Sequence, residues 1–147
     1  MDLFYSIWTM MIASFAIQYI VMSLIMSNVP SNITFSVGKF YISVMMAILM
    51  GLVEVSMFDY HMKTLHITYY LSLFIGFTIF LYLYKSQAWI NDDEYLKEMI
   101  EHHSMALLTS EEILQKTKSE RVKKLADNIV ATQTAEIDYM KRILTGN

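Results

Sequence analysis

The chain has 147 residues, of which 55% are hydrophobic, and it contains thirteen methionines and no cysteine. The lack of cysteine excludes disulfides and thiolate metal sites. Residues 1–90 hold three basic and three acidic side chains, whereas residues 91–147 hold eight basic and eleven acidic ones, which accounts for the net charge of −3. We therefore expect a membrane domain over 1–90 and a water-facing domain over 91–147. Because the water-facing part is acidic, we expect no nucleic acid partner.

Three apolar stretches predict membrane-spanning helices at about 3–26, 40–58 and 67–84. A helix crosses a hydrocarbon core of roughly 30 Å with about 20 residues, and the third stretch is slightly short for this. The first stretch has no basic leader and no small-residue cleavage site, so we expect a retained span rather than a signal peptide. These features predict an integral, multi-pass membrane protein whose first partner is the lipid bilayer. The lysines beside the spans are too few to decide its orientation.

A few residues in this apolar part are candidates for function. Glu54 lies in the second stretch, where an ionisable side chain is a functional hypothesis, although pairing near the interface is a simpler explanation. The second stretch also places Met46, Met50, Glu54 and Met57 on one face, a methionine ladder that helix packing explains as well as metal passage does. The following turn offers a second set of ligands, namely Asp59, His61, Met62 and His66. Asn32-Ile33-Thr34 fits a glycosylation sequon.

The water-facing part predicts two helices, from Asp92 to about Lys116 and from Arg121 to Leu144. Both stretches lack Pro and Gly. Asn91 or Asp92 can cap the first helix, Ser119 can cap the second, and Gly146 can end it. With a turn near 117–119, the fold class is all-α: three transmembrane helices followed by an antiparallel two-helix hairpin.

Polar residues interrupt the apolar stripes of both predicted helices. The first stripe contains Tyr95, Met99, His102, His103 and Ala106, and the second is interrupted by Gln133 and Glu136. In an antiparallel hairpin, residues whose numbers add up to about 236 lie opposite one another. His103 then faces Gln133, and Met99 faces Ile137 with Glu136 and Met140 within one turn.

The polar residues that meet at this height of the predicted hairpin indicate a metal site. A buried carboxylate is costly unless it is paired or bound to a metal. Imidazole, thioether and carboxylate at one height suit a soft or borderline metal, and we expect a copper ion.

The two motifs resemble a known family. The first reads Asp93-x-Tyr95-Leu96-x-x-Met99-Ile100-x-His102-His103-x-Met105-Ala106, and the second reads Leu125-Ala126-x-x-Ile129-x-x-x-Gln133-x-x-Glu136-Ile137-x-x-Met140. In order and spacing they are similar to the family called domain of unknown function 305, in its membrane-anchored branch. The resemblance implies a ferritin-like helical fold, here half a bundle, and an association with copper or silver. It implies site residues at Met99, His102, His103, Met105, Gln133, Glu136 and Met140, whereas Thr109 replaces a methionine often found there.

Three functions compete on this basis. The first is metal storage, sequestration or handover, in which one of His102 and His103 is the direct ligand. The second is structural, in which His103 pairs with Gln133 or Glu136 and sets the register of a helical oligomer. The third, a di-metal redox enzyme, is disfavoured because Glu98 precedes His102 by four residues rather than three. We therefore expect no enzyme and name no catalytic residues.

A two-helix hairpin buries too little apolar surface to be stable alone in water. It needs the membrane spans or a second copy as a partner, and we expect a homo-oligomer through the hairpin.

Overall fold

The computed structural model describes residues 2–146, and within this range the chain forms helices and loops without any strand. This confirms the predicted all-α class. The chain divides into two compact units. The first contains residues 2–21 and 37–89, and the second contains residues 22–36 and 90–146.

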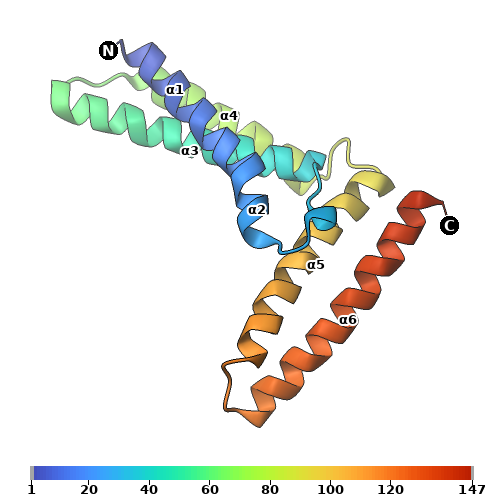
Figure 1. The fold of residues 1–147 in the computed structure, drawn as a ribbon. Coiled ribbons are helices and arrows are strands. Elements are labelled where there is room, and N and C mark those ends of the chain that lie inside the picture. Colours follow the sequence, from blue (N-terminus) through green and yellow to red (C-terminus); the bar gives the residue numbers. More distant parts are fainter. Residues whose placement is uncertain (1, 147) are drawn as a thin grey trace. The chain divides into compact units, whose positions relative to one another are not determined.

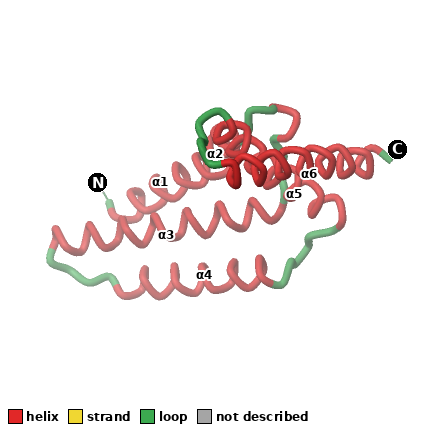
Figure 2. The backbone as a smooth tube through the Cα atoms, turned by 90° about the horizontal axis from the view of Figure 1, so that it is seen from below, coloured by secondary structure: helices red, strands yellow, loops and turns green. Residues whose placement is uncertain are grey.

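The first unit is built from α1 (Leu3–Ala16) with a π-helical turn (Ile17–Val21), α3 (Val37–Met62) and α4 (Ile67–Lys85). Helix α3 packs against both α1 and α4 (Figure 2). The stretches Leu3–Met26, Val37–Met62 and Ile67–Lys85 are each long and apolar enough to cross a membrane. The second of these helices is longer than the predicted 40–58, because Asp59 to Met62 continue the helix instead of forming a turn.

Small residues allow the helices of the first unit to approach closely. Helix α3 buries Ser43, Ala47, Gly51 and Val55, which are spaced four apart and so form one ridge. A Cβ atom on Gly51 would lie only 3.1 Å from both Cγ and Sδ of Met11 on α1. Close backbone approach through small residues is how apolar helices associate where no hydrophobic force acts between them.

The second unit contains the hairpin of α5 (Asp92–Leu114) and α6 (Glu120–Thr145), which Figure 1 shows side by side. Its core consists of Leu96, Ile100, Ile137 and Met140, with Leu107 and Leu144 packed against it. The hairpin begins and ends as its caps predict. Asn91 accepts a hydrogen bond from Glu94 N at 2.9 Å, Ser119 accepts one from Val122 N at 3.4 Å, and Gly146 has φ 71°.

Residues 22–36, here called the docking segment, belong to the same compact unit as the hairpin. The segment contains α2 (Met22–Met26) and a short 3₁₀ turn (Pro30–Asn32), and both pack against α5. The sequence predicted a span that ends at residue 26 and a loop over 27–39, with the hairpin as a separate domain from residue 91. The structure instead provides a partner for α5 from within the same chain.

The Gly51 contact makes a prediction about the first unit. Gly51→Leu should force α1 away from α3 and lower the unfolding free energy by about 1–3 kcal/mol, as overpacking of a filled interior does. Gly51→Ala should be tolerated, because the flexible Met11 side chain can move by a few tenths of an ångström. Thermal unfolding of the full chain in detergent measures both variants, with Gly76→Ala as control because a Cβ there meets only Ile48 Cδ1, at 3.6 Å. Equal stability of Gly51→Leu and the unsubstituted protein would refute the close approach.

Candidate functional site

His103 lies between the two helices of the hairpin and contacts both. Its Nδ1 lies 2.7 Å from the backbone oxygen of Met99 on its own helix. Its Nε2 lies 2.9 Å from Oε2 of Glu136 on α6. The side chain of His103 is 15% exposed and that of Glu136 is 49% exposed, so the pair lies at the edge of the interface between the helices.

Both nitrogens of His103 face hydrogen-bond acceptors. A carbonyl oxygen and a carboxylate oxygen accept but do not donate, whereas a neutral imidazole has only one N–H. With Nδ1 at the Met99 carbonyl, Nε2 faces the Glu136 carboxylate, where the two groups could hold a metal ion together. Metal-ligating histidines are commonly oriented by a hydrogen bond from the other ring nitrogen to a backbone carbonyl. The contact of His103 Nδ1 with Met99 O has this geometry.

The remaining predicted site residues fall into three groups: one contacts the His103–Glu136 pair, two pack in or against the hairpin core, and two are exposed. Gln133 joins the pair, because its Nε2 donates to Glu136 Oε2 at 3.3 Å. Met140 is buried in the hairpin core, and the Met99 side chain packs against that core. His102 and Met105 are exposed. Among residues 2–146, no three His, Asp or Glu side chains gather closely enough to hold a metal ion.

The part of α5 that precedes the histidine pair is acidic. Asp92, Asp93 and Glu94 occupy the first turn, and Lys97 Nζ donates to Glu94 Oε1 at 2.7 Å, which raises the pKa of Lys97. Burial raises the pKa of the Glu98 carboxyl; His102 opposes this rise, and the charge of Glu101 adds to it. The excess of carboxylates favours a cation near His102 and His103.

Glu101 and Ser104 flank the histidine pair and hold the docking segment, a role that the sequence analysis missed. Glu101 accepts hydrogen bonds from Ser23 Oγ and from the backbone N and Oγ1 of Thr34, the latter two at 3.3 Å. Ser104 Oγ lies 2.6 Å from Ser27 Oγ and accepts from Asn32 Nδ2 at 3.1 Å. Ser27, Asn32 and Ser104 are all buried, so these bonds exchange no partner with water.

Asn32 also connects the docking segment to α6. Lys141 Nζ donates to Asn32 Oδ1 at 2.5 Å and to Ser31 Oγ at 3.2 Å. Both ends of the Asn32 amide are thus engaged, and the residue is only 3% exposed. The sequon that begins at Asn32 is therefore inaccessible in the folded unit.

The sequence contains part of the pattern that underlies the contact between α5 and the docking segment. Lys97, Glu101 and Ser104 recur at spacings of four and three on a face of α5 different from that of His103. Serine, asparagine and threonine are frequent between residues 23 and 36. No periodicity within a loop could show which helix these side chains would contact.

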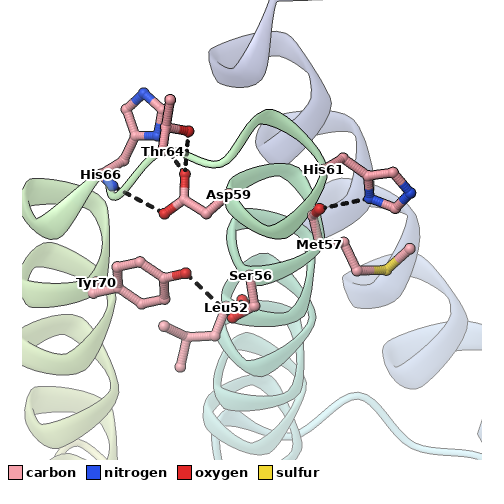
Figure 3. Close-up of polar contacts among 8 residues, drawn as sticks. All are labelled: Leu52, Ser56, Met57, Asp59, His61, Thr64, His66 and Tyr70. Atoms are coloured by element: carbon pink, nitrogen blue, oxygen red, sulfur yellow. Dashed lines mark hydrogen bonds and ion pairs between the residues drawn. The ribbon is translucent and has the colours of Figure 1, made fainter.

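The second predicted ligand set is only partly brought together (Figure 3). Asp59 is buried and accepts from His66 Nδ1 at 2.5 Å, from His66 N at 2.9 Å and from Thr64 Oγ1 at 3.1 Å. His61 instead contacts the backbone oxygen of Met57 at 2.8 Å, and Figure 3 shows it on the other side of α3 from His66. Asp59 therefore joins the end of α3 to the start of α4, where a carboxylate is favoured by the helix dipole.

The candidates inside the second apolar helix differ in their surroundings. Glu54 accepts a hydrogen bond from Ser6 Oγ on α1, which agrees with the simpler explanation that this side chain is paired. Met46 and Met57 of the methionine ladder are exposed on the surface of the first unit, so packing within this unit does not explain them.

Comparison with known proteins identifies the hairpin. A family described as Domain of unknown function (DUF305) matches residues 83–144. The chain is also 33% identical over 135 residues to the uncharacterized protein L153 of Acanthamoeba polyphaga mimivirus, covering 92% of this chain and 88% of that protein. The chain belongs to the DUF305 family. This confirms the resemblance seen in the two motifs, and no solved structure matches the chain. The DUF305 match includes His103, Glu136, Glu101 and Ser104, whereas the docking segment precedes it.

The docking of residues 22–36 on the DUF305 hairpin can be tested directly because the chain has no cysteine. The double variant Ser27→Cys/Ser104→Cys should form a disulfide under mild oxidation, since the two hydroxyl oxygens lie 2.6 Å apart. Labelling with a maleimide-polyethylene glycol counts the thiols that remain. The control Asn28→Cys/Ser104→Cys, with Asn28 exposed, should keep both thiols. Equal labelling of the two double variants would disprove the docking.

Proposed function

We propose that this DUF305 protein is an integral membrane protein whose hairpin binds a metal ion, copper above all, in storage, sequestration or handover. The observation that carries the proposal is the His103 imidazole held between Met99 O and the Glu136 carboxylate. A metal ion held by Nε2 and the Glu136 carboxylate would leave the contact of Nδ1 with Met99 O in place.

The chemistry of the surrounding donors supports copper over harder metals. Gln133 and Glu136 supply oxygen, and His103 supplies nitrogen. Met99 and Met140, both next to this level, would supply thioether sulfur after a change of rotamer, and soft sulfur ligands select Cu(I). His102 lies on the exposed face of α5, where it is available as an additional ligand. Together with the exposed Met105, these are the site residues that the family resemblance implies, and the resemblance also implies a ferritin-like half-bundle.

The membrane part of the proposal depends on the three apolar helices. Each is long enough to span the hydrocarbon core, and the one carboxylate inside the second helix, Glu54, is paired with Ser6. A membrane provides the apolar solvent that the many exposed Phe, Leu and Ile side chains of α1 and α4 require.

A second function, a purely structural one, is favoured by one observation. Met99 and Met140 pack in the hairpin core rather than toward His103. On this alternative the His103–Glu136–Gln133 contacts set the register of α5 on α6, and no metal ion is bound.

Copper binding is the first measurement. The detergent-purified full chain should bind Cu(I) in competition with a chromophoric chelator, and His103→Ala should lower the affinity by at least about tenfold, as loss of a metal-site partner does. His61→Ala is the matched control, because His61 lies outside the hairpin, and it should bind as the unsubstituted protein does. If the double variant His102→Ala/His103→Ala binds Cu(I) equally well, the metal site is not in the hairpin.

Substitutions of Glu136 separate the two functions. If Glu136 holds a metal, Glu136→Gln should weaken Cu(I) binding by about 10–100-fold and leave the thermal stability unchanged. If the pair only sets register, Glu136→Gln should be silent in both assays while Glu136→Leu changes the oligomeric state. Light scattering of the detergent complex, beside the Cu(I) titration, distinguishes these results.

A further inference from the structure

The docking segment, residues 22–36, has the opposite polarity to a surface that faces water. The residues that it buries are all polar, namely Ser23, Ser27, Asn32 and Ser36. Most of the residues that it exposes are apolar, namely Leu24, Ile25, Val29, Pro30 and Phe35. Helix α6 shows the reverse, since it buries only apolar residues and exposes charged ones such as Lys123 and Asp127. An exposed apolar face over a buried polar one indicates that the docking segment contacts an apolar medium.

The backbone of the docking segment is suited to such a medium. The backbone N–H groups that donate to acceptors within the second unit include those of Val29, Asn32, Ile33 and Thr34. Val29 N, for example, donates to Ser27 Oγ at 3.2 Å, and the proline at position 30 has no N–H to satisfy. Near hydrocarbon an unpaired backbone group is costly, so irregular backbone is tolerated there only where it has partners in the protein.

The position of the docking segment in the chain indicates which medium this is. The apolar stretch Leu3–Met26 is long enough to cross a membrane, and it ends inside the segment. A segment that follows directly on a span begins at the boundary between hydrocarbon and water. Residues 22–36 also carry no charged side chain, so none has to be removed from water at this boundary. The exposed polar residues Asn28 and Ser31 suit the headgroups that lie there.

We propose that the docking segment lies in the interfacial region of a lipid bilayer, with its exposed apolar side chains among the acyl chains and its buried polar side chains on α5. The segment would then hold the DUF305 hairpin at the membrane surface. Glu101 and Ser104, which bond the segment, lie on either side of the two histidines along α5. The turn of α5 that carries His103 is therefore held at this surface. The inference rests on the membrane part of the proposed function and is independent of metal binding.

Spin labelling of the full chain tests this contact, because the chain has no cysteine. Leu24→Cys and Phe35→Cys are labelled one at a time with a nitroxide and reconstituted into phosphatidylcholine vesicles. Power saturation measures collisions of the label with molecular oxygen, which concentrates in hydrocarbon, and with a neutral nickel chelate, which stays in water. We expect an oxygen-to-nickel collision ratio severalfold higher at both positions than at Leu125→Cys. Leu125 on α6 is the matched control, since it is a leucine with 60% exposure against 61% for Leu24.

A label at Phe74→Cys, on the exposed surface of α4, provides the reference for a side chain that faces lipid. If Leu24→Cys and Phe35→Cys give the ratio of Leu125→Cys while Phe74→Cys gives a severalfold higher one, the proposed contact is wrong and the membrane assignment stands. Few collisions with either reagent at positions 24 and 35 would show that protein covers the segment, which also overturns the inference. If Phe74→Cys itself behaves as Leu125→Cys does, the membrane part of the proposed function fails together with the inference.

Discussion

The second unit depends on one constraint: polar groups on α5 that leave water must each meet a partner. Consecutive residues on a helix are about 100° apart, so His103 points toward a different neighbour from Glu101 and Ser104. His103 meets Glu136 on α6, whereas Glu101 and Ser104 meet the docking segment. Because an unsatisfied buried group costs about 1–3 kcal/mol, these bonds hold α5 in one rotational setting. A rotation of the helix would break all of them together.

The adjacent histidines differ in role for the same reason. His103 is held between two acceptors and points into the hairpin, while His102 is exposed on the neighbouring face. Of the two, only His103 has both ring nitrogens within hydrogen-bond distance of oxygen atoms in the hairpin. The two adjacent histidines therefore differ: His103 is held in one orientation inside the hairpin, whereas His102 is accessible from outside it.

Polar residues also hold the ends of the first unit. Asp59 connects the end of α3 to the start of α4 through His66 and Thr64, and Tyr41 donates to Ala88 O at 2.8 Å beyond the end of α4. The docking segment comprises the end of the first apolar stretch and the loop before α3, and it is bound by Glu101, Ser104 and Lys141 of the hairpin. The DUF305 hairpin therefore contacts the chain between α1 and α3, as well as following α4 in the sequence.

The sequence by itself determined the helices, their caps and the level at which His103 meets the polar residues of α6, because local periodicity and capping are encoded in neighbouring residues. It also determined the family, through two motifs of fixed spacing. Only the tertiary structure decided that Glu136 contacts Nε2 directly while Gln133 supports it, and that Met99 and Met140 pack in the core. It alone decided that residues 22–36 dock on α5. Such contacts join residues about 70 positions apart, and their energy depends on burial that no local pattern contains.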